Sequence, residues 1–128
     1  MQECLAVGLG GFIGSILRYL AGFLPIGFDN LPVAALNGFP LKTFLINVTG
    51  AFLIGIIAAM AAKNPLMDKR WVLFLKVGIC GGFTTFSTFA LEIGELIRNG
   101  LWLTVALYAI LSATCAVMAF FAGCAVGN

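Results

Sequence analysis

Histidine is absent from this chain, and charged side chains are scarce. Among 128 residues there is no histidine, and only 9% of the residues are charged. Without histidine the chain lacks the commonest general base and metal ligand. Soluble domains carry roughly 25% charged residues, so most of this protein's surface must face something other than water. The net charge of +2 is also too small to indicate a nucleic-acid-binding protein.

The cysteines form no metal-binding or redox motif. No two of them are separated by two residues, and all lie within or at the edge of apolar segments, at Cys4, Cys80, Cys115 and Cys124. Buried free cysteine usually behaves as a small hydrophobic side chain. The pattern therefore predicts packing, and it supports neither a disulfide framework nor a zinc site.

The chain is rich in long apolar segments. Hydrophobic residues make up 62% of it, and the mean hydropathy is +1.11. A helix needs about 20 apolar residues to cross a bilayer, and four stretches reach that length: 4–24, 43–62, 71–97 and 101–124. The first lacks the basic start of a signal peptide, so we expect it to be retained. The sequence predicts an all-α membrane protein with one transmembrane domain of four helices over residues 1–128.

The distribution of Lys and Arg gives little preference for one orientation in the membrane. With four spans, the termini and the 63–70 loop share one side, and the 25–42 and 98–100 connectors share the other. Basic residues set orientation, and here they divide almost evenly: Lys63, Lys69, Arg70 and Lys76 against Arg18, Lys42 and Arg98. Two oppositely inserted copies would form an antiparallel homodimer, equivalent to an inverted repeat. A single orientation fixed by the basic 63–70 loop is the alternative.

A glycine pair and two polar residues stand out in the first and second stretches. Gly10 and Gly14 form a GxxxG spacing, which predicts close helix packing. Arg18 lies deep in the first stretch, where a charge is costly; it either lines a water-filled vestibule that attracts anions or extends to the nearby interface. Asn47 lies within the second stretch. Its amide donates two hydrogen bonds, which suits either an anion or contact between helices.

The third stretch contains the most unusual segment. It reads Gly-Gly-Phe-Thr-Thr-Phe-Ser-Thr-Phe over residues 81–89, and its midpoint is near Thr84. Paired glycines and repeated hydroxyl groups weaken a helix, so we expect a break near 81–88. Irregular backbone at mid-membrane depth persists only where it is buried or lines a cavity. Such breaks commonly bind ions through carbonyl groups and helix ends, although a packing kink remains the alternative.

Further polar residues follow in the third and fourth stretches. Glu92 lies beyond the expected break, while Tyr108 and Ser112 are spaced to share one helix face. Together with Asn47 and Thr88, they predict a track of hydrogen-bonding groups through the membrane.

These residues resemble the Fluc (CrcB) family of fluoride channels, and the resemblance covers essentially the whole chain. The matching segments are residues 10–19 (GGFIGSILRY), Asn47 with residues 50–52 (GAF), and residues 81–89 (GGFTTFSTF). The resemblance implies a dual-topology antiparallel homodimer in the lipid bilayer with two pores. It implies that Asn47, Phe86, Phe89, Tyr108, Ser112 and Glu92 are pore residues. A further hydroxyl group found in some members would fall at Ala116, so the far end of the track differs here.

The resemblance also implies a structural sodium ion at the dimer centre, bound by the backbone carbonyls of Gly81 and Thr84. The implied function is passive export of fluoride from the cytoplasm through the bacterial inner membrane. One alternative is a small multidrug-resistance-type transporter, which requires an embedded carboxylate in its first span, where this chain carries Arg18. Another is a non-transporting membrane assembly subunit, which would not need a mid-membrane break. No nucleophile and base are arranged as in an enzyme.

Overall fold

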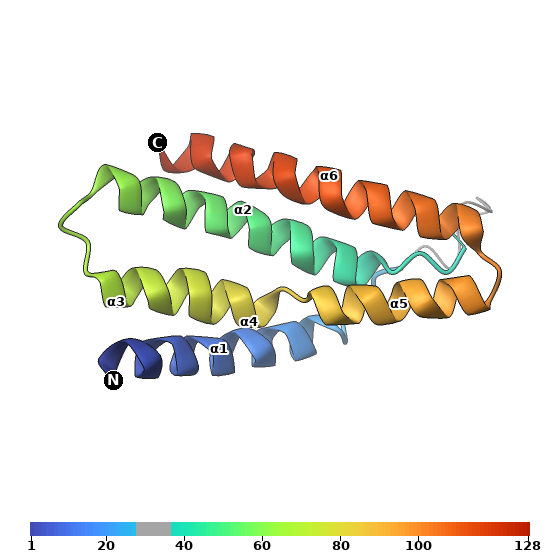
Figure 1. Cartoon of the computed structure of the whole chain (residues 1–128), viewed down its shortest axis with the longest axis horizontal. Coiled ribbons are helices and arrows are strands. Elements are labelled where there is room, and N and C mark those ends of the chain that lie inside the picture. Colours follow the sequence, from blue (N-terminus) through green and yellow to red (C-terminus); the bar gives the residue numbers. More distant parts are fainter. Residues whose placement is uncertain (28–36) are drawn as a thin grey trace.

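The computed structural model describes residues 1–27 and 37–128, and it is entirely helical apart from turns and short connectors over those residues. Four helical segments in the described residues are long and apolar enough to cross a membrane: Gln2–Ala21, Leu41–Lys63, Lys69–Arg98 and Trp102–Gly127. Figure 1 shows them side by side along the long axis of the molecule. The predicted multi-pass membrane protein is therefore confirmed. Residues 28–36 of the predicted 25–42 connector lie outside the described residues.

The first helix, α1 (Gln2–Ala21), ends earlier than the sequence predicted. The apolar run continues to residue 24, but the backbone N–H groups of Phe23 and Leu24 donate to the carbonyls three residues earlier, Leu20 and Ala21, at 3.0 and 3.2 Å. Hydrogen bonds of this spacing tighten the chain into turns at a helix end. The helical part of the first segment is therefore shorter than its apolar run.

The third segment changes its backbone geometry four times. It begins as α3 (Lys69–Val72), continues as the π-helix η2 (Leu73–Cys80) and ends its first part in α4 (Gly81–Phe83). Thr84 and Thr85 then have extended backbone, with a ψ of 159° and a φ of −154° respectively, before α5 (Phe86–Arg98) begins. Figure 1 shows this two-residue interruption as a thin link between α4 and α5.

Glycines allow α1 to contact the third segment directly through its backbone. A side chain at Gly10 would collide with the Phe74 carbonyl, and one at Gly14 would collide with the Ile79 carbonyl. A side chain at Gly82 would likewise collide with the Gly11 carbonyl on α1. The predicted packing role of Gly10 and Gly14 is confirmed, since only residues without a Cβ permit this approach.

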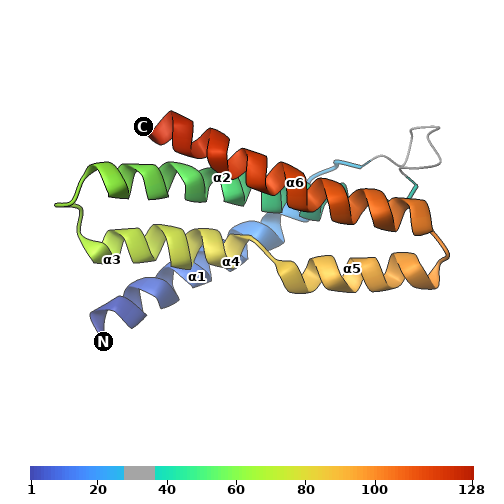
Figure 2. The ribbon, with the colours of Figure 1, turned by 45° about the horizontal axis from the view of Figure 1, so that its top comes forward.

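The second helix, α2 (Leu41–Lys63), packs along α6 (Trp102–Gly127), and glycines again lie at the contact. A side chain at Gly55 would collide with the Phe120 carbonyl, and one at Gly123 would collide with the Phe52 carbonyl. The molecule thus consists of two closely packed pairs, α1 with η2 and α4, and α2 with α6 (Figures 1 and 2). The interruption lies where the third segment passes from α1 toward α6.

Ion pairs lie at the end of the bundle that carries both termini. The N-terminus, the C-terminus and the connector between α2 and α3 lie at one end (Figure 1). There Lys69 contacts Glu3 at 3.0 Å and Arg70 contacts Asp68 at 2.6 Å. Hydrogen bonds from the Arg70 side chain and backbone hold the pKa of Asp68 below its usual value.

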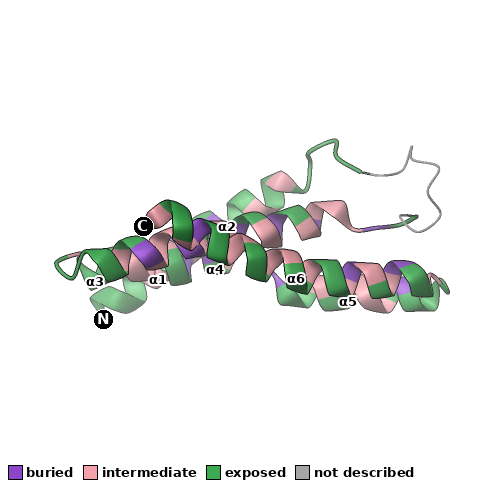
Figure 3. Cartoon of the chain, turned by 90° about the horizontal axis from the view of Figure 1, so that it is seen from above, coloured by how far each residue is buried: buried purple, intermediate pink, exposed green. Residues whose placement is uncertain are grey.

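Much of the helical surface is exposed, as Figure 3 shows. Exposed apolar side chains include Phe12 on α1 and Phe121 on α6, at 67% and 65%. A buried cluster of Phe39, Leu96 and Tyr108 lies toward the end opposite the termini. Such an apolar exterior is expected where the surrounding medium is lipid or another helix rather than water.

Candidate functional site

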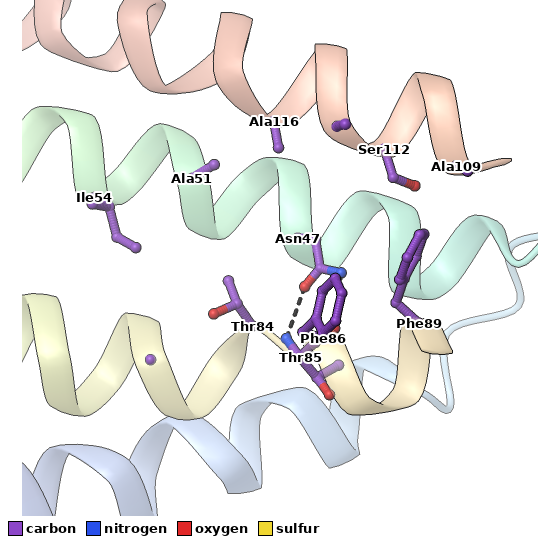
Figure 4. Close-up of a pocket in the computed structure, with 12 residues that line it drawn as sticks. Asn47, Ala51, Ile54, Thr84, Thr85, Phe86, Phe89, Ala109, Ser112 and Ala116 are labelled. Atoms are coloured by element: carbon purple, nitrogen blue, oxygen red, sulfur yellow. Dashed lines mark hydrogen bonds between the residues drawn. The ribbon is translucent and has the colours of Figure 1, made fainter. Parts of the chain in front are cut away.

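Asn47 on α2 holds the interrupted segment between α4 and α5. Its Nδ2 donates to the Thr85 carbonyl at 3.1 Å, and its Oδ1 accepts from the Thr85 N–H at 2.8 Å. The dashed line in Figure 4 marks the second of these bonds. Extended backbone cannot satisfy its own polar groups within a helix, and unpaired groups are costly in an apolar medium. The Asn47 amide therefore replaces the missing helical partners of Thr85.

The hydroxyl group of Thr85 caps the N-terminus of α5. It accepts a hydrogen bond from the Thr88 N–H at 3.2 Å, the pattern of an N-cap. It also donates to the Thr88 hydroxyl at 3.0 Å and lies 3.3 Å from the Ser87 hydroxyl. The threonines that weaken a continuous helix here provide the polar partners for beginning a new one.

Arg18 and Cys80 provide contacts on the α4 side of the interruption. The Thr84 N–H and hydroxyl group both donate to the Cys80 carbonyl, at 2.9 and 2.8 Å. The Thr84 carbonyl accepts from Arg18 Nη1 at 3.3 Å. A cation near the carboxyl end of a helix is favourable because the helix dipole is negative there. Arg18 therefore binds the end of α4 while also facing a second cavity described below.

A cavity of about 560 Å³ opens beside the interruption. Figure 4 shows its walls, with Asn47 on α2 facing the interruption and Ser112 and Ala116 on α6 above it. Predicted site residues in its lining are Asn47, Gly81, Thr84, Phe86, Phe89 and Ser112. The cavity is mostly apolar, with a few polar groups, as is typical of small-ligand sites.

The two phenylalanines after the interruption lie next to each other. The ring centroids of Phe86 and Phe89 are 5.5 Å apart, and Phe89 is 4.9 Å from the ring of Tyr108. Phe86 is 79% exposed in the single chain, whereas Tyr108 is fully buried. The aromatic row therefore runs from the surface of the chain to its interior.

Ser112 has a polar atom without a partner. Its Oγ is buried, and it makes no hydrogen bond with any group in residues 1–27 and 37–128. Buried polar groups of this kind usually bind water, an ion or another group. Ala116 lines the same cavity one turn further along α6, where a methyl group contributes no hydrogen bond.

Glu92 is held by two hydroxyl groups from different helices. Thr43 on α2 donates to Glu92 Oε1 at 2.6 Å, and Tyr108 on α6 donates to Oε2 at 2.7 Å. Sequence reasoning did not select Thr43. It lies four residues before Asn47, on the same face of α2, and that spacing is the signal that indicates it.

A second cavity, of about 450 Å³, lies on the other side of this polar group. Its lining includes Arg18 from α1, Lys42 and Thr43 from α2, and Thr88 and Glu92 from α5. Thr85 lines both cavities. We refer to the two spaces as the first and second cavities.

The structure divides the predicted site residues between these spaces. Asn47, Phe86, Phe89 and Ser112 line the first cavity, and Arg18, Thr88 and Glu92 line the second. Tyr108 lines neither cavity, but it lies between them because it contacts both Phe89 and Glu92. One chain therefore brings the predicted residues to a single region, although it does not join them into one continuous hydrogen-bonded track.

The predicted ligands of a cation in this region are the backbone carbonyls of Gly81 and Thr84. No cluster of three or more Cys, Asp or Glu residues suited to a metal ion occurs in the part of the chain that the structure describes. Gly81 and Thr84 line the first cavity, and space is open beside the Gly81 Cα. A carbonyl oxygen has two lone pairs, so the Arg18 contact leaves one available on Thr84. These carbonyls fit a hard monovalent cation, but two from one chain make an incomplete set.

The fold and the site define a small multi-pass membrane protein with a polar, aromatic-lined interruption in its third membrane segment. Residues 5–124 match the family described as "CrcB-like protein, Camphor Resistance (CrcB)". The chain belongs to this family.

Relatives from several bacteria bear the name "Fluoride-specific ion channel FluC". The relative from Chlorobaculum tepidum is 44% identical over 84% of this chain and 80% of its own length. The one from Nitrobacter winogradskyi is 45% identical over 93% of this chain and 90% of its own. The one from Azobacteroides pseudotrichonymphae is 36% identical over 98% and 90%. The similarity therefore extends across all four membrane segments.

Proposed function

We propose that this protein is a fluoride-specific ion channel that passively exports fluoride from the cytoplasm through the bacterial inner membrane and so lowers its toxicity. The observation that carries the proposal is the Asn47-held interruption beside an aromatic-lined cavity, in a chain similar throughout to relatives named as fluoride channels. A channel needs no catalytic groups, and the protein is not an enzyme. Neither the multidrug transporter nor the assembly subunit is favoured by these relatives.

The first cavity supplies groups suited to a small, strongly hydrated anion. Asn47 donates one of its two amide hydrogens to Thr85, which leaves the second for an ion. The Ser112 hydroxyl has no partner among the described residues and faces the same space. Hydrogen bonds to a charged partner contribute about 1.5–3 kcal/mol each. These two groups would replace part of the water that fluoride loses.

Phe86 and Phe89 would form the apolar part of the pathway. An aromatic ring is negative on its face and positive at its edge, so an anion passes favourably along ring edges. This attraction is weak, and conduction requires binding weak enough for the ion to leave. Tyr108, Thr88 and Glu92 would continue the polar track, with Arg18 attracting anions in the second cavity, which serves as a vestibule.

We further propose that the working unit is an antiparallel homodimer of dual topology. Phe86 is largely exposed in the single chain, and the first cavity is open. A second copy would enclose both. The nearly even division of Lys and Arg between the two sides supports opposite insertion. In such a dimer the mid-membrane interruptions of both chains approach the two-fold axis.

A structural sodium ion at this axis forms the remaining part of the proposal. The carbonyls of Gly81 and Thr84 from each of two chains would hold it, and as hard oxygen ligands they suit a hard cation. Sodium would there neutralise the carbonyl dipoles of the two interruptions. Replacement of sodium by a large organic cation should lower the melting temperature of the purified dimer, and an unchanged value would contradict the site.

Efflux from liposomes tests the proposed function. Liposomes that contain the purified protein are loaded with potassium fluoride or potassium chloride, and valinomycin is added to balance charge. We expect rapid fluoride release and chloride release close to that of empty liposomes. Equal release of the two anions, or release of neither, would contradict the proposal.

A further inference from the structure

Lys42 lies at the second cavity, and its position is fixed by a hydrogen bond. Its Nζ donates to the Gly22 carbonyl, at the carboxyl end of α1, at 2.8 Å. Lys42 is the second residue of α2 and lines the second cavity with Arg18 and Glu92. The bond connects α2 to α1 at the end of the bundle opposite the termini.

The charges around the second cavity do not cancel. Within residues 1–27 and 37–128, neither Arg18 nor Lys42 takes part in an ion pair. The carboxylate of Glu92 is already bound by two neutral hydroxyl groups, those of Thr43 and Tyr108. The lining therefore has two cations and one anion, and both cations are directed to backbone carbonyls.

The net positive charge of the second cavity acts on ions that approach from solution. A cleft with low-dielectric walls and a net charge concentrates ions of the opposite sign and raises their rate of entry. The Gly22 carbonyl keeps the ammonium group at the cavity, whereas a free lysine would sample many positions in solvent. Lys42 lies at the start of its helix, closer to the aqueous phase than Arg18 at the interruption.

We propose that Lys42 is an entry residue, which raises the local anion concentration in the second cavity before the ion reaches Arg18. This inference rests on the proposed channel function and adds a rate-determining role to a residue outside the predicted pore. A simpler role is also physically reasonable, since a lysine that caps a helix end stabilises the helix. The two roles differ in their dependence on ionic strength.

The experiment compares Lys42→Gln with wild type in the liposome assay at low and high ionic strength, adjusted with an impermeant salt. Lys42→Gln removes the charge and retains a hydrogen-bond donor. We expect fluoride efflux about threefold below wild type at about 10 mM ionic strength, where the Debye length is about 30 Å. At about 1 M, where the Debye length is about 3 Å, the difference should fall below about 1.5-fold.

Two controls separate charge from structure. Lys42→Arg retains both the charge and the donor, so it should match wild type at both ionic strengths. Lys63→Gln removes the charge of a lysine that does not line the second cavity, and it should also match wild type. A loss in Lys42→Gln that is equal at both ionic strengths would assign Lys42 to helix capping and overturn the proposal. No loss at low ionic strength would overturn it as well.

Wild-type protein provides a test that needs no variant. Its own fluoride efflux should fall as ionic strength rises, and a flat dependence would contradict the entry role even if Lys42→Gln failed to fold. Wild-type protein that releases no fluoride at any ionic strength would instead refute the channel function itself. The two failures are therefore distinguishable within one set of measurements.

Discussion

Asn47 and Thr85 pair as two peptide groups would pair in a sheet. The side-chain amide of Asn47 donates to the Thr85 carbonyl and accepts from the Thr85 N–H, at 3.1 and 2.8 Å. A side chain on α2 thereby completes the backbone hydrogen bonding of a different membrane segment. The same amide has a second hydrogen, and Asn47 lines the first cavity. Asn47 therefore combines a structural role with the proposed role in fluoride binding.

Replacement of Asn47 by leucine should affect both roles. The variant leaves the Thr85 N–H and carbonyl without partners, which costs about 1–3 kcal/mol for each unsatisfied buried group. We expect a lower melting temperature. We also expect fluoride efflux to fall about tenfold or more, because a lost hydrogen bond to the ion of about 1.4 kcal/mol corresponds to a factor of ten. Thr49→Val, at an exposed position on the same helix, is the matched control. Wild-type efflux and stability in Asn47→Leu would assign the residue to neither role.

Replacement of Phe86 or Phe89 by isoleucine tests the aromatic pathway. Isoleucine retains an apolar side chain but removes the positive ring edge. Each variant should therefore reduce fluoride efflux while gel filtration shows an unchanged oligomer. Phe121→Ile on α6 is the control, because this phenylalanine is exposed outside both cavities. If both single variants conduct normally, the ring-edge mechanism is wrong, although the channel function is not.

Tyr108→Phe isolates the hydroxyl group that binds Glu92. The ring contacts with Phe89 and Phe39 remain, since their centroid distances of 4.9 and 5.3 Å involve only the ring. Loss of the hydroxyl group leaves one carboxylate oxygen of Glu92 without its donor. We expect reduced fluoride efflux with little change in assembly. Thr43→Val should act in the same direction, and Thr43→Ser, which retains the donor, should not.

Labelling of a single cysteine tests dual topology. Cys4 is exposed near the N-terminus, and a variant with alanine at Cys80, Cys115 and Cys124 retains it alone. A membrane-impermeant thiol reagent, added to intact cells and then to lysed cells, should label about half of the protein from each side if insertion is even. Labelling from one side only would establish a fixed orientation and rule out the antiparallel dimer.

The sequence predicted the membrane architecture well because apolar length and composition determine it. The four spans and the close packing at Gly10 and Gly14 follow from residue type and spacing alone. The two-residue extent of the interruption did not follow, because it depends on Asn47 and Arg18 binding Thr85 and Thr84 from other helices. The π-helix η2 was also missed, since no local residue signal marks it.

The site was predicted less completely than the fold. Asn47, Phe86 and Glu92 stand out as polar or repeated residues in apolar segments, whereas Thr43 becomes visible only through its 2.6 Å contact with Glu92. Lys42 likewise reads as an ordinary interfacial lysine until the structure places it at the second cavity. Contacts between helices distant in sequence depend on tertiary packing, which one sequence does not specify residue by residue. The roles proposed for the pore residues stay predictions.

The central claim is fluoride selectivity, and a bi-ionic reversal potential measures it most directly. Purified protein is incorporated into a planar bilayer with sodium fluoride on one side and an equal concentration of sodium chloride on the other. A fluoride-specific channel should carry current that reverses far from zero, with the sign set by fluoride leaving its own side. A reversal potential near zero would show that fluoride and chloride permeate equally and would contradict the account.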